Sequence, residues 1–137
     1  MKLKYSTRLV IILKNVVIKI PVSRRGFLQG RNEKKIWVKY NLIAPLAELK
    51  WEYIGIVCQK RYSQADVIST ASVNQIKEII PEFAFTGCDL HNFKNWGVER
   101  NKSILLDYGI NKHISTLYKE DEEMGFVEKA FTRIGAL

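Results

Sequence analysis

Two aspartates in the second half of the chain lie in settings that suit phosphoryl transfer. Asp89 opens an amide-rich stretch, Asp89-Leu90-His91-Asn92-Phe93-Lys94-Asn95, and Asp107 follows the apolar run Ile104-Leu105-Leu106. Transfer from ATP needs one aspartate beside the acceptor hydroxyl. It also needs a second aspartate which, with an amide oxygen, holds magnesium on the phosphates. Carboxylate and amide oxygens are the ligands that such a hard cation prefers. The residue types therefore predict a site for a metal-bound triphosphate.

At these residues the chain resembles the protein-kinase superfamily, especially its aminoglycoside- and choline-kinase-like branch and small kinase-like phage proteins. Asp89-Leu90-His91 with a following asparagine resembles the catalytic loop of that branch, and Leu106-Asp107-Tyr108-Gly109 resembles its metal-binding turn. The resemblance implies that Asp89 is the catalytic base or the acid that orients the acceptor. It also implies that Asp107 and Asn95 bind magnesium. Asn92 is a rival ligand, because Asn95 lies one residue further from Asp89 than the family spacing.

The resemblance extends upstream and covers about residues 8–109 in the correct order. Val16-Val17-Ile18-Lys19 resembles the strand whose lysine binds the α- and β-phosphates of ATP. Lys19 is then the phosphate-binding residue, and Glu33 is its ion-pair partner. Gln59-Lys60-Arg61 corresponds to the hinge that meets adenine, which makes Gln59 and Lys60 nucleotide contacts.

Apolar periodicity predicts the elements that position the upstream residues. Residues 8–13 and 16–20 form two β-branched runs separated by Lys14-Asn15, which predicts a hairpin. Residues 23–30 contain two glycines and two arginines and predict a loop. From 31 to 40 the period is helical and places Glu33 on the same face as the apolar residues Ile36, Trp37 and Tyr40. A carboxylate is therefore expected on the buried stripe of that helix.

The remaining elements follow from breaks at Pro45 and Pro81. Strands are expected at 46–49 and 52–59, with 53–58 as a central strand, and a helix is expected at 66–80. Residues 82–98 show no clear period, residues 104–106 form a short strand, and a last helix spans 120–131. The core side chains expected from the helix at 66–80 are Val67, Ile68, Ala71, Ile76, Ile79 and Ile80.

The expected fold class is α+β, as a minimal protein-kinase-like fold. It has an antiparallel sheet of about four or five strands with one packed helix, and below it a truncated helical C-lobe. Residues 1–137 form one domain, in which about 1–60 is N-lobe-like and 61–137 is C-lobe-like. The chain contains no Gly-x-Gly-x-x-Gly before the first hairpin, so the loop that covers the phosphates is absent or reduced to Tyr5-Ser6-Thr7.

Composition limits the partners of the protein. The chain has 22 Lys and Arg against 14 acidic residues, a net charge of +8, which favours polyanionic ligands. No apolar run is long enough to cross a bilayer, so no membrane association is expected. Cys58 and Cys88 predict reduced thiols in a cytoplasmic protein.

The predicted function is ATP- and Mg²⁺-dependent phosphotransfer to a protein or a small hydroxyl acceptor. One alternative is a pseudokinase-like protein that binds and modulates a partner, which the missing glycine loop and the short segment after Gly109 favour. A second alternative is a basic nucleic-acid-binding module. Simpler interpretations also exist, since aspartates are common in turns and Lys19 could be an ordinary surface lysine. A protein partner and a homo-oligomer are both compatible with the sequence.

Overall fold

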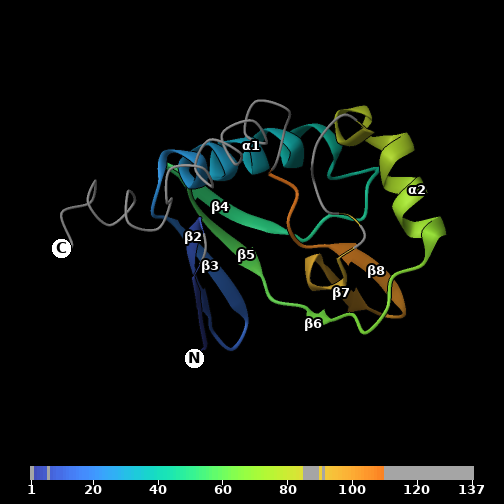
Figure 1. Cartoon of the computed structure of the whole chain (residues 1–137), viewed down its shortest axis with the longest axis horizontal. Helices are drawn as coiled ribbons and strands as arrows, with labels where there is room; N and C mark the ends of the chain where they lie inside the picture. The colour runs from blue at the N-terminus through green and yellow to red at the C-terminus, as the bar shows by residue number, and fades with distance from the viewer. Residues whose placement is uncertain (1, 6, 85–89, 91, 110–137) are drawn as a thin grey trace, which may run out of the picture.

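The computed structural model describes residues 2–5, 7–84, 90 and 92–109, and within them it forms an α+β fold with two antiparallel sheets (Figure 1). The larger sheet has five strands in the order β1-β2-β3-β5-β4, and the smaller has three in the order β6-β7-β8. The strands are β1 (Lys2–Tyr5), β2 (Arg8–Ile12), β3 (Val16–Pro21), β4 (Leu49–Tyr53), β5 (Ile56–Lys60), β6 (Ser63–Gln64), β7 (Trp96–Glu99) and β8 (Lys102–Leu105). The helices are α1 (Arg24–Tyr40) and α2 (Thr70–Ile79), with short 3₁₀ turns η1 (Pro81–Ala84) and η2 (Phe93–Asn95).

The hairpin expected from the first two β-branched runs is confirmed as β2 and β3. Ile11 pairs with Ile18, and the backbone N–H of Leu13 donates to the carbonyl of Val16 at 2.9 Å to close the turn. β1 pairs with β2 on the outer side and was not predicted. Because β3 pairs with β2 on one side and β5 on the other, Lys19 belongs to an inner strand of the sheet.

Helix α1 begins earlier than its periodicity indicates. Residues 24–30, expected in a loop, form its first two turns, and the side chain of Ser23 caps them by accepting from the N–H of Gly26 at 3.1 Å. The glycines that suggested a loop instead permit close packing. A β-carbon at Gly26 would clash with the carbonyl of Thr7, and one at Gly30 would clash with the carbonyl of Gly55. α1 therefore packs closely against β3, β5 and β4 (Figure 1).

The expected central strand at 53–58 is wrong, because a turn divides it into β4 and β5. Ile54 and Gly55 have φ values of 45° and 85°, a conformation that ends one strand and starts the next. The expected strand at 46–49 is also largely wrong. Leu46 makes an isolated bridge to Leu105, and only Leu49 belongs to β4.

Helix α2 begins four residues later than expected, after the cap residue Ser69. Val67 and Ala71, expected in the core, are exposed, because Val67 lies before the helix begins and Ala71 is on its solvent face. Ile76 is buried as expected, and Val73 joins it.

The hydrophobic core joins the C-terminal half of α1 to α2 and to the β7–β8 hairpin, with Trp96 fully buried in it. Cys58 of β5 is a buried free thiol, whereas Cys88 lies outside the described residues. Among the described residues, no helix has the length and apolar character needed to span a membrane. The helix expected at 120–131 also lies outside the described residues.

Candidate functional site

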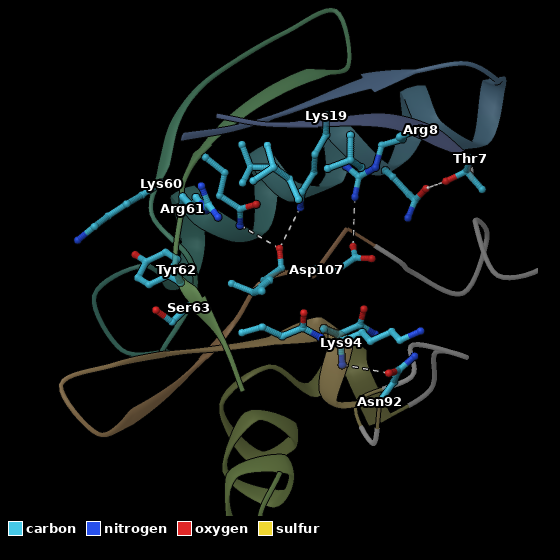
Figure 2. Close-up of a pocket in the computed structure, with 18 of the residues that line it drawn as sticks. Thr7, Arg8, Lys19, Lys60, Arg61, Tyr62, Ser63, Asn92, Lys94 and Asp107 are labelled. Atoms are coloured by element: carbon cyan, nitrogen blue, oxygen red, sulfur yellow. Dashed lines mark hydrogen bonds and ion pairs between the residues drawn. The ribbon is translucent and has the colours of Figure 1, made fainter. Parts of the chain in front are cut away.

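A cleft of about 890 Å³ separates the five-stranded sheet from the smaller sheet (Figure 2). Its upper wall in the figure comes from β2 and β3, with Val10 and Val17 as apolar members. Its back is the chain from β5 to β6, and its lower wall is η2 with the residues that follow β8. The described side chains that were expected to bind phosphate, adenine and metal all reach this cleft or its inner end, although they come from separate elements.

Lys19 projects from β3 into the inner end of the cleft, where its side chain is only 8% exposed. Its Nζ lies 3.2 Å from Oε1 of Glu33 and donates to the carbonyl oxygen of Leu106 at 2.9 Å. Burial lowers the pKa of Lys19 below its usual value, although the neighbouring Glu33 carboxylate acts in the opposite direction. The lysine is thus held in place by two acceptors and lies at the surface of the cleft.

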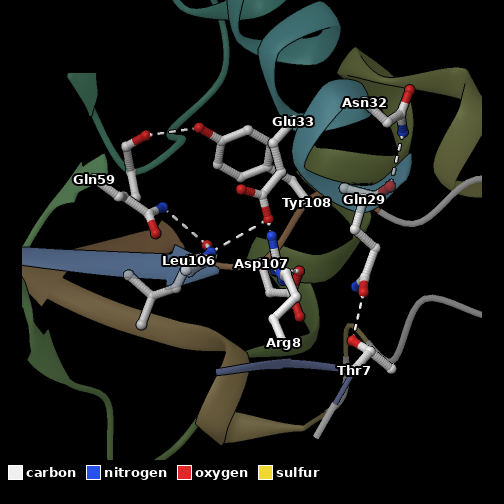
Figure 3. A network of polar contacts seen from close by, with 12 residues as sticks. Thr7, Arg8, Gln29, Asn32, Glu33, Gln59, Leu106, Asp107 and Tyr108 are labelled. Atoms are coloured by element: carbon white, nitrogen blue, oxygen red, sulfur yellow. Dashed lines mark hydrogen bonds and ion pairs between the residues drawn. The ribbon is translucent and has the colours of Figure 1, made fainter. Parts of the chain in front are cut away.

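Glu33 lies on α1 with its side chain fully buried, which explains the carboxylate on the apolar stripe. Its Oε1 accepts hydrogen bonds from both Lys19 and Arg8, at 3.2 and 2.8 Å (Figure 3). The expected contact between Lys19 and Glu33 is therefore present. α1 begins nine residues before Glu33, at Arg24, so Glu33 lies well beyond the first turn of the helix.

Arg8 is a member of the site that was not predicted from the sequence. It is the first residue of β2, and its side chain is 5% exposed. Its Nη2 lies 2.8 Å from Oε1 of Glu33 and 3.2 Å from Oδ1 of Asp107, so that it bridges the two carboxylates (Figure 3). The sequence signal for Arg8 was its position as a charged residue at the start of a β-branched run. A charged side chain that is buried there needs a partner of opposite charge.

Asp107 follows β8 and turns its partly exposed carboxylate, 34% accessible, toward the cleft. Burial works against its ionisation, but the charges of Arg8 and Lys19 outweigh burial and hold the pKa of this carboxyl below its usual value. Asp107 is therefore an anion at neutral pH, in direct contact with the guanidinium of Arg8.

The two residues after Asp107 fix the backbone on which it lies. The hydroxyl of Tyr108 donates to the carbonyl of Ala47 at 2.9 Å, and the carbonyl of Gly109 accepts from Nδ2 of Asn32 at 3.0 Å. Burial raises the pKa of the Tyr108 phenol, which keeps its proton and remains a donor. A β-carbon on Gly109 would clash with the carbonyl of Gln29 in α1, so only glycine permits this approach.

The two asparagines considered as metal ligands both line the cleft. The backbone carbonyl of Asn95 accepts from the N–H of Leu106 at 2.8 Å, which places η2 beside the segment that leads to Asp107. The side-chain oxygen of Asn92 accepts from the N–H of Lys94 at 3.0 Å and thereby caps η2. This bond gives the Asn92 side chain a structural role.

The two hinge residues differ in position. Gln59 is 2% exposed, and its Nε2 donates at 2.9 Å to the carbonyl of Leu106, the same atom that accepts from Lys19. Lys60 lies at the cleft rim, with its Nζ 2.7 Å from Oε1 of Glu99. Gln59 therefore joins the larger sheet to the segment before Asp107, while Lys60 stays at the solvent edge.

The cleft lining is strongly cationic. Among the described residues that line it, one is acidic and six are cationic, namely Asp107 and the set Arg8, Lys14, Lys19, Lys60, Arg61 and Lys94. Lys14, Arg61 and Lys94 are exposed. A cleft with this charge concentrates anionic ligands, and its size is that of a small-molecule site.

The described residues of the cleft do not fit a divalent cation as they are arranged. Among the described residues, no group of three or more acidic, histidine or cysteine side chains is gathered to hold a metal. Asp107 supplies one carboxylate, and its Oδ1 is 3.2 Å from the guanidinium of Arg8. A cation that close to the same oxygen would repel magnesium. Asp89, the expected catalytic acid, lies outside the described residues.

Comparison of the chain with protein-family models, with curated proteins and with solved structures gives no match in any of the three cases.

Proposed function

We propose that the protein is a kinase-like domain that binds a nucleoside triphosphate, ATP, in the cleft between its two sheets. The observation that carries the proposal is the Lys19–Glu33 contact, 3.2 Å long, at the inner end of a cationic cleft that also exposes Asp107. A buried lysine held by a helix glutamate is the arrangement that the resemblance implies for binding the α- and β-phosphates.

The architecture supports this proposal. A five-stranded antiparallel sheet carries one helix, and the strand that contains Lys19 lies inside that sheet. The smaller sheet borders the cleft from the other side, and Asp107 lies just after its last strand. A minimal kinase-like fold with a reduced C-lobe is expected to have this arrangement.

The cleft has separate places for the two parts of a nucleotide. Apolar side chains of β2 and β3, including Val10 and Val17, form a wall against which a base can pack. The base would then lie near the chain after Gln59, and the phosphates would lie at the inner end beside Lys19 and Arg8. The uncharged base of the nucleotide would then pack on apolar side chains, and its charged phosphates would lie among cations, so each part has a suitable environment.

Phosphotransfer to a protein or small hydroxyl acceptor is the reaction that the proposal predicts for bound ATP. Asp89 is the proposed acid beside the acceptor, and catalysis would depend chiefly on positioning and charge. A second candidate is a pseudokinase-like protein that binds nucleotide without turnover and modulates a partner. The Arg8–Asp107 ion pair favours this candidate, because Asp107, the carboxylate expected to bind the metal, already binds a guanidinium.

Calorimetric titration with ATP, adenosine and tripolyphosphate tests the binding proposal. ATP should bind more tightly than either fragment, since only ATP fills both the apolar wall and the cationic end. Release of γ-phosphate, followed with radiolabelled ATP, then separates a transferase from a non-catalytic binder. If instead a single-stranded oligonucleotide binds and ATP does not, with an affinity that falls steeply with salt, the nucleic-acid alternative is correct.

A further inference from the structure

We propose that Arg8 binds the triphosphate in the role usually taken by a divalent cation, so that this cleft takes up metal-free ATP at least as tightly as Mg-ATP. This inference rests on the proposed nucleotide-binding function and specifies the ligand of that same site: a nucleoside triphosphate without a bound metal.

The position of Arg8 is the first argument. Its guanidinium lies inside the cleft lining, at the end where Lys19 and Asp107 also meet (Figure 2). Contacts to Glu33 at 2.8 Å and Asp107 at 3.2 Å hold the side chain in one place. A guanidinium carries several donors in a planar fork and binds phosphate oxygens through paired hydrogen bonds. Arg8 is therefore a cation already fixed beside the expected phosphate position.

The charge balance is the second argument. The described residues that line the cleft include six cationic side chains and one acidic side chain, so they present a net positive charge to an anionic ligand. Mg-ATP is still an anion, but its metal offsets part of the triphosphate charge and would lie close to the fixed cations Arg8 and Lys19, which repel it. A metal-free triphosphate instead meets Arg8, Lys19 and the cations of the rim, and it carries more negative charge than its magnesium complex.

Asp107 gives the inference its sharpest consequence. If Asp107 binds magnesium on the phosphates, its replacement by asparagine must weaken nucleotide binding. If Arg8 supplies the charge, Asp107 only competes with the phosphates for the guanidinium. The variant Asp107→Asn should then release Arg8 from that competition and tighten binding of metal-free ATP by about threefold or more.

The experiment is calorimetric titration of the full chain with ATP in two buffers, one with EDTA and one with excess MgCl₂. The dissociation constant in EDTA should be lower than that in magnesium, or should agree with it within a factor of about three. Asp107→Asn should bind ATP in EDTA more tightly than wild type. Arg8→Lys, which keeps the charge but loses the fork, should weaken that binding about tenfold. Lys35→Ala, an exposed lysine of α1 outside the cleft, is the charge control and should change little.

The failures of the inference and of the proposed function are distinguishable. Binding that weakens more than about threefold when magnesium is removed, or binding in excess MgCl₂ that weakens more than about threefold in Asp107→Asn, overturns the inference and leaves the nucleotide site intact. Absence of ATP binding in both buffers overturns the proposed function and the inference with it. Circular dichroism of each variant shows whether it is folded, and Asp107→Asn decides the inference even if Arg8→Lys fails to fold.

Discussion

The ammonium of Lys19 lies 3.2 Å from Oε1 of Glu33, which joins an inner strand of the larger sheet to the helix that covers it. Arg8 shares the same oxygen at 2.8 Å and extends the contact to Asp107, which follows the smaller sheet. Four charged residues from β2, β3, α1 and the segment after β8 thus meet at one place. Changes to this group, or to the backbone that supports it, should alter ligand binding, stability or both.

Replacement of Lys19 by methionine should separate binding from stability. Methionine approximates the length of the side chain but removes the charge that is proposed to bind phosphate, so ATP affinity should fall about tenfold or more, about 1.4 kcal/mol. Stability should change little or rise, because burial of the ammonium is costly and Glu33 keeps Arg8 as a partner. Calorimetry and urea denaturation measure the two effects. Lys19→Met that binds ATP like wild type would exclude the lysine from the site.

Glu33→Gln should destabilise the fold severely. Two buried cations, Arg8 and Lys19, share this carboxylate, and loss of its charge removes their common counter-ion. We expect a loss of about 3–5 kcal/mol in the free energy of unfolding. Urea denaturation measures it against Glu78→Gln, the same change on the exposed surface of α2, which should stay within about 0.5 kcal/mol. Equal stabilities for the two variants would show that the buried network contributes nothing.

Gly109→Ala should disturb the site through the backbone. The new methyl group would clash with the carbonyl of Gln29 and with the side chain of Glu33, so the chain after Asp107 must move away from α1. We expect a loss of about 1–3 kcal/mol in the free energy of unfolding, with weaker ATP binding. Asn32→Ala is the comparison, because it removes only the hydrogen bond to the Gly109 carbonyl and adds no bulk. A tolerated alanine at position 109 would contradict this close packing.

Some elements could be predicted well from the sequence, because their information is local. The β2–β3 hairpin follows from two β-branched runs, and the end of α2 follows from Pro81. The first two turns of α1 could not be predicted, since Gly26 and Gly30 serve contacts with Thr7 and Gly55 that no local pattern records. β4 and β5 were merged for a similar reason, because Ile54 gave no sign of its positive φ.

Prediction of the site depended on what the resemblance could supply. The resemblance placed Lys19, Glu33 and Asp107 in one predicted site, and the structure brings these three residues together at one end of the cleft. It gave no reason to include Arg8, whose contact with Asp107 spans 99 positions of the sequence. Contacts of that separation are set by the tertiary fold and leave no spacing pattern in the chain.

Stability in acid should depend on Asp107. Its pKa is held below the unfolded value of about 3.9, so it contributes stability above that pH, and this contribution is lost as the pH falls through the folded-state pKa. The free-energy difference between wild type and Asp107→Asn, measured by urea denaturation, should therefore be constant near neutrality and shrink below about pH 4. Glu82 and Glu99 also have lowered pKa values, but wild type and Asp107→Asn both contain these residues, so their contributions cancel in the difference. A difference that stays constant down to about pH 2 would contradict the ion pair with Arg8.

The measurement that tests the central claim most directly is the melting temperature of the wild-type protein with and without ATP, in magnesium and in EDTA. A ligand that binds only the folded state stabilises it by about 2.7 kcal/mol at about a hundred times its dissociation constant. For a chain of 137 residues this predicts a rise of at least about 5 °C in one or both buffers, and a smaller rise with adenosine alone or in Lys19→Met, whose affinity is about tenfold lower. A melting temperature that ATP leaves unchanged in both buffers would contradict a nucleotide site in this cleft.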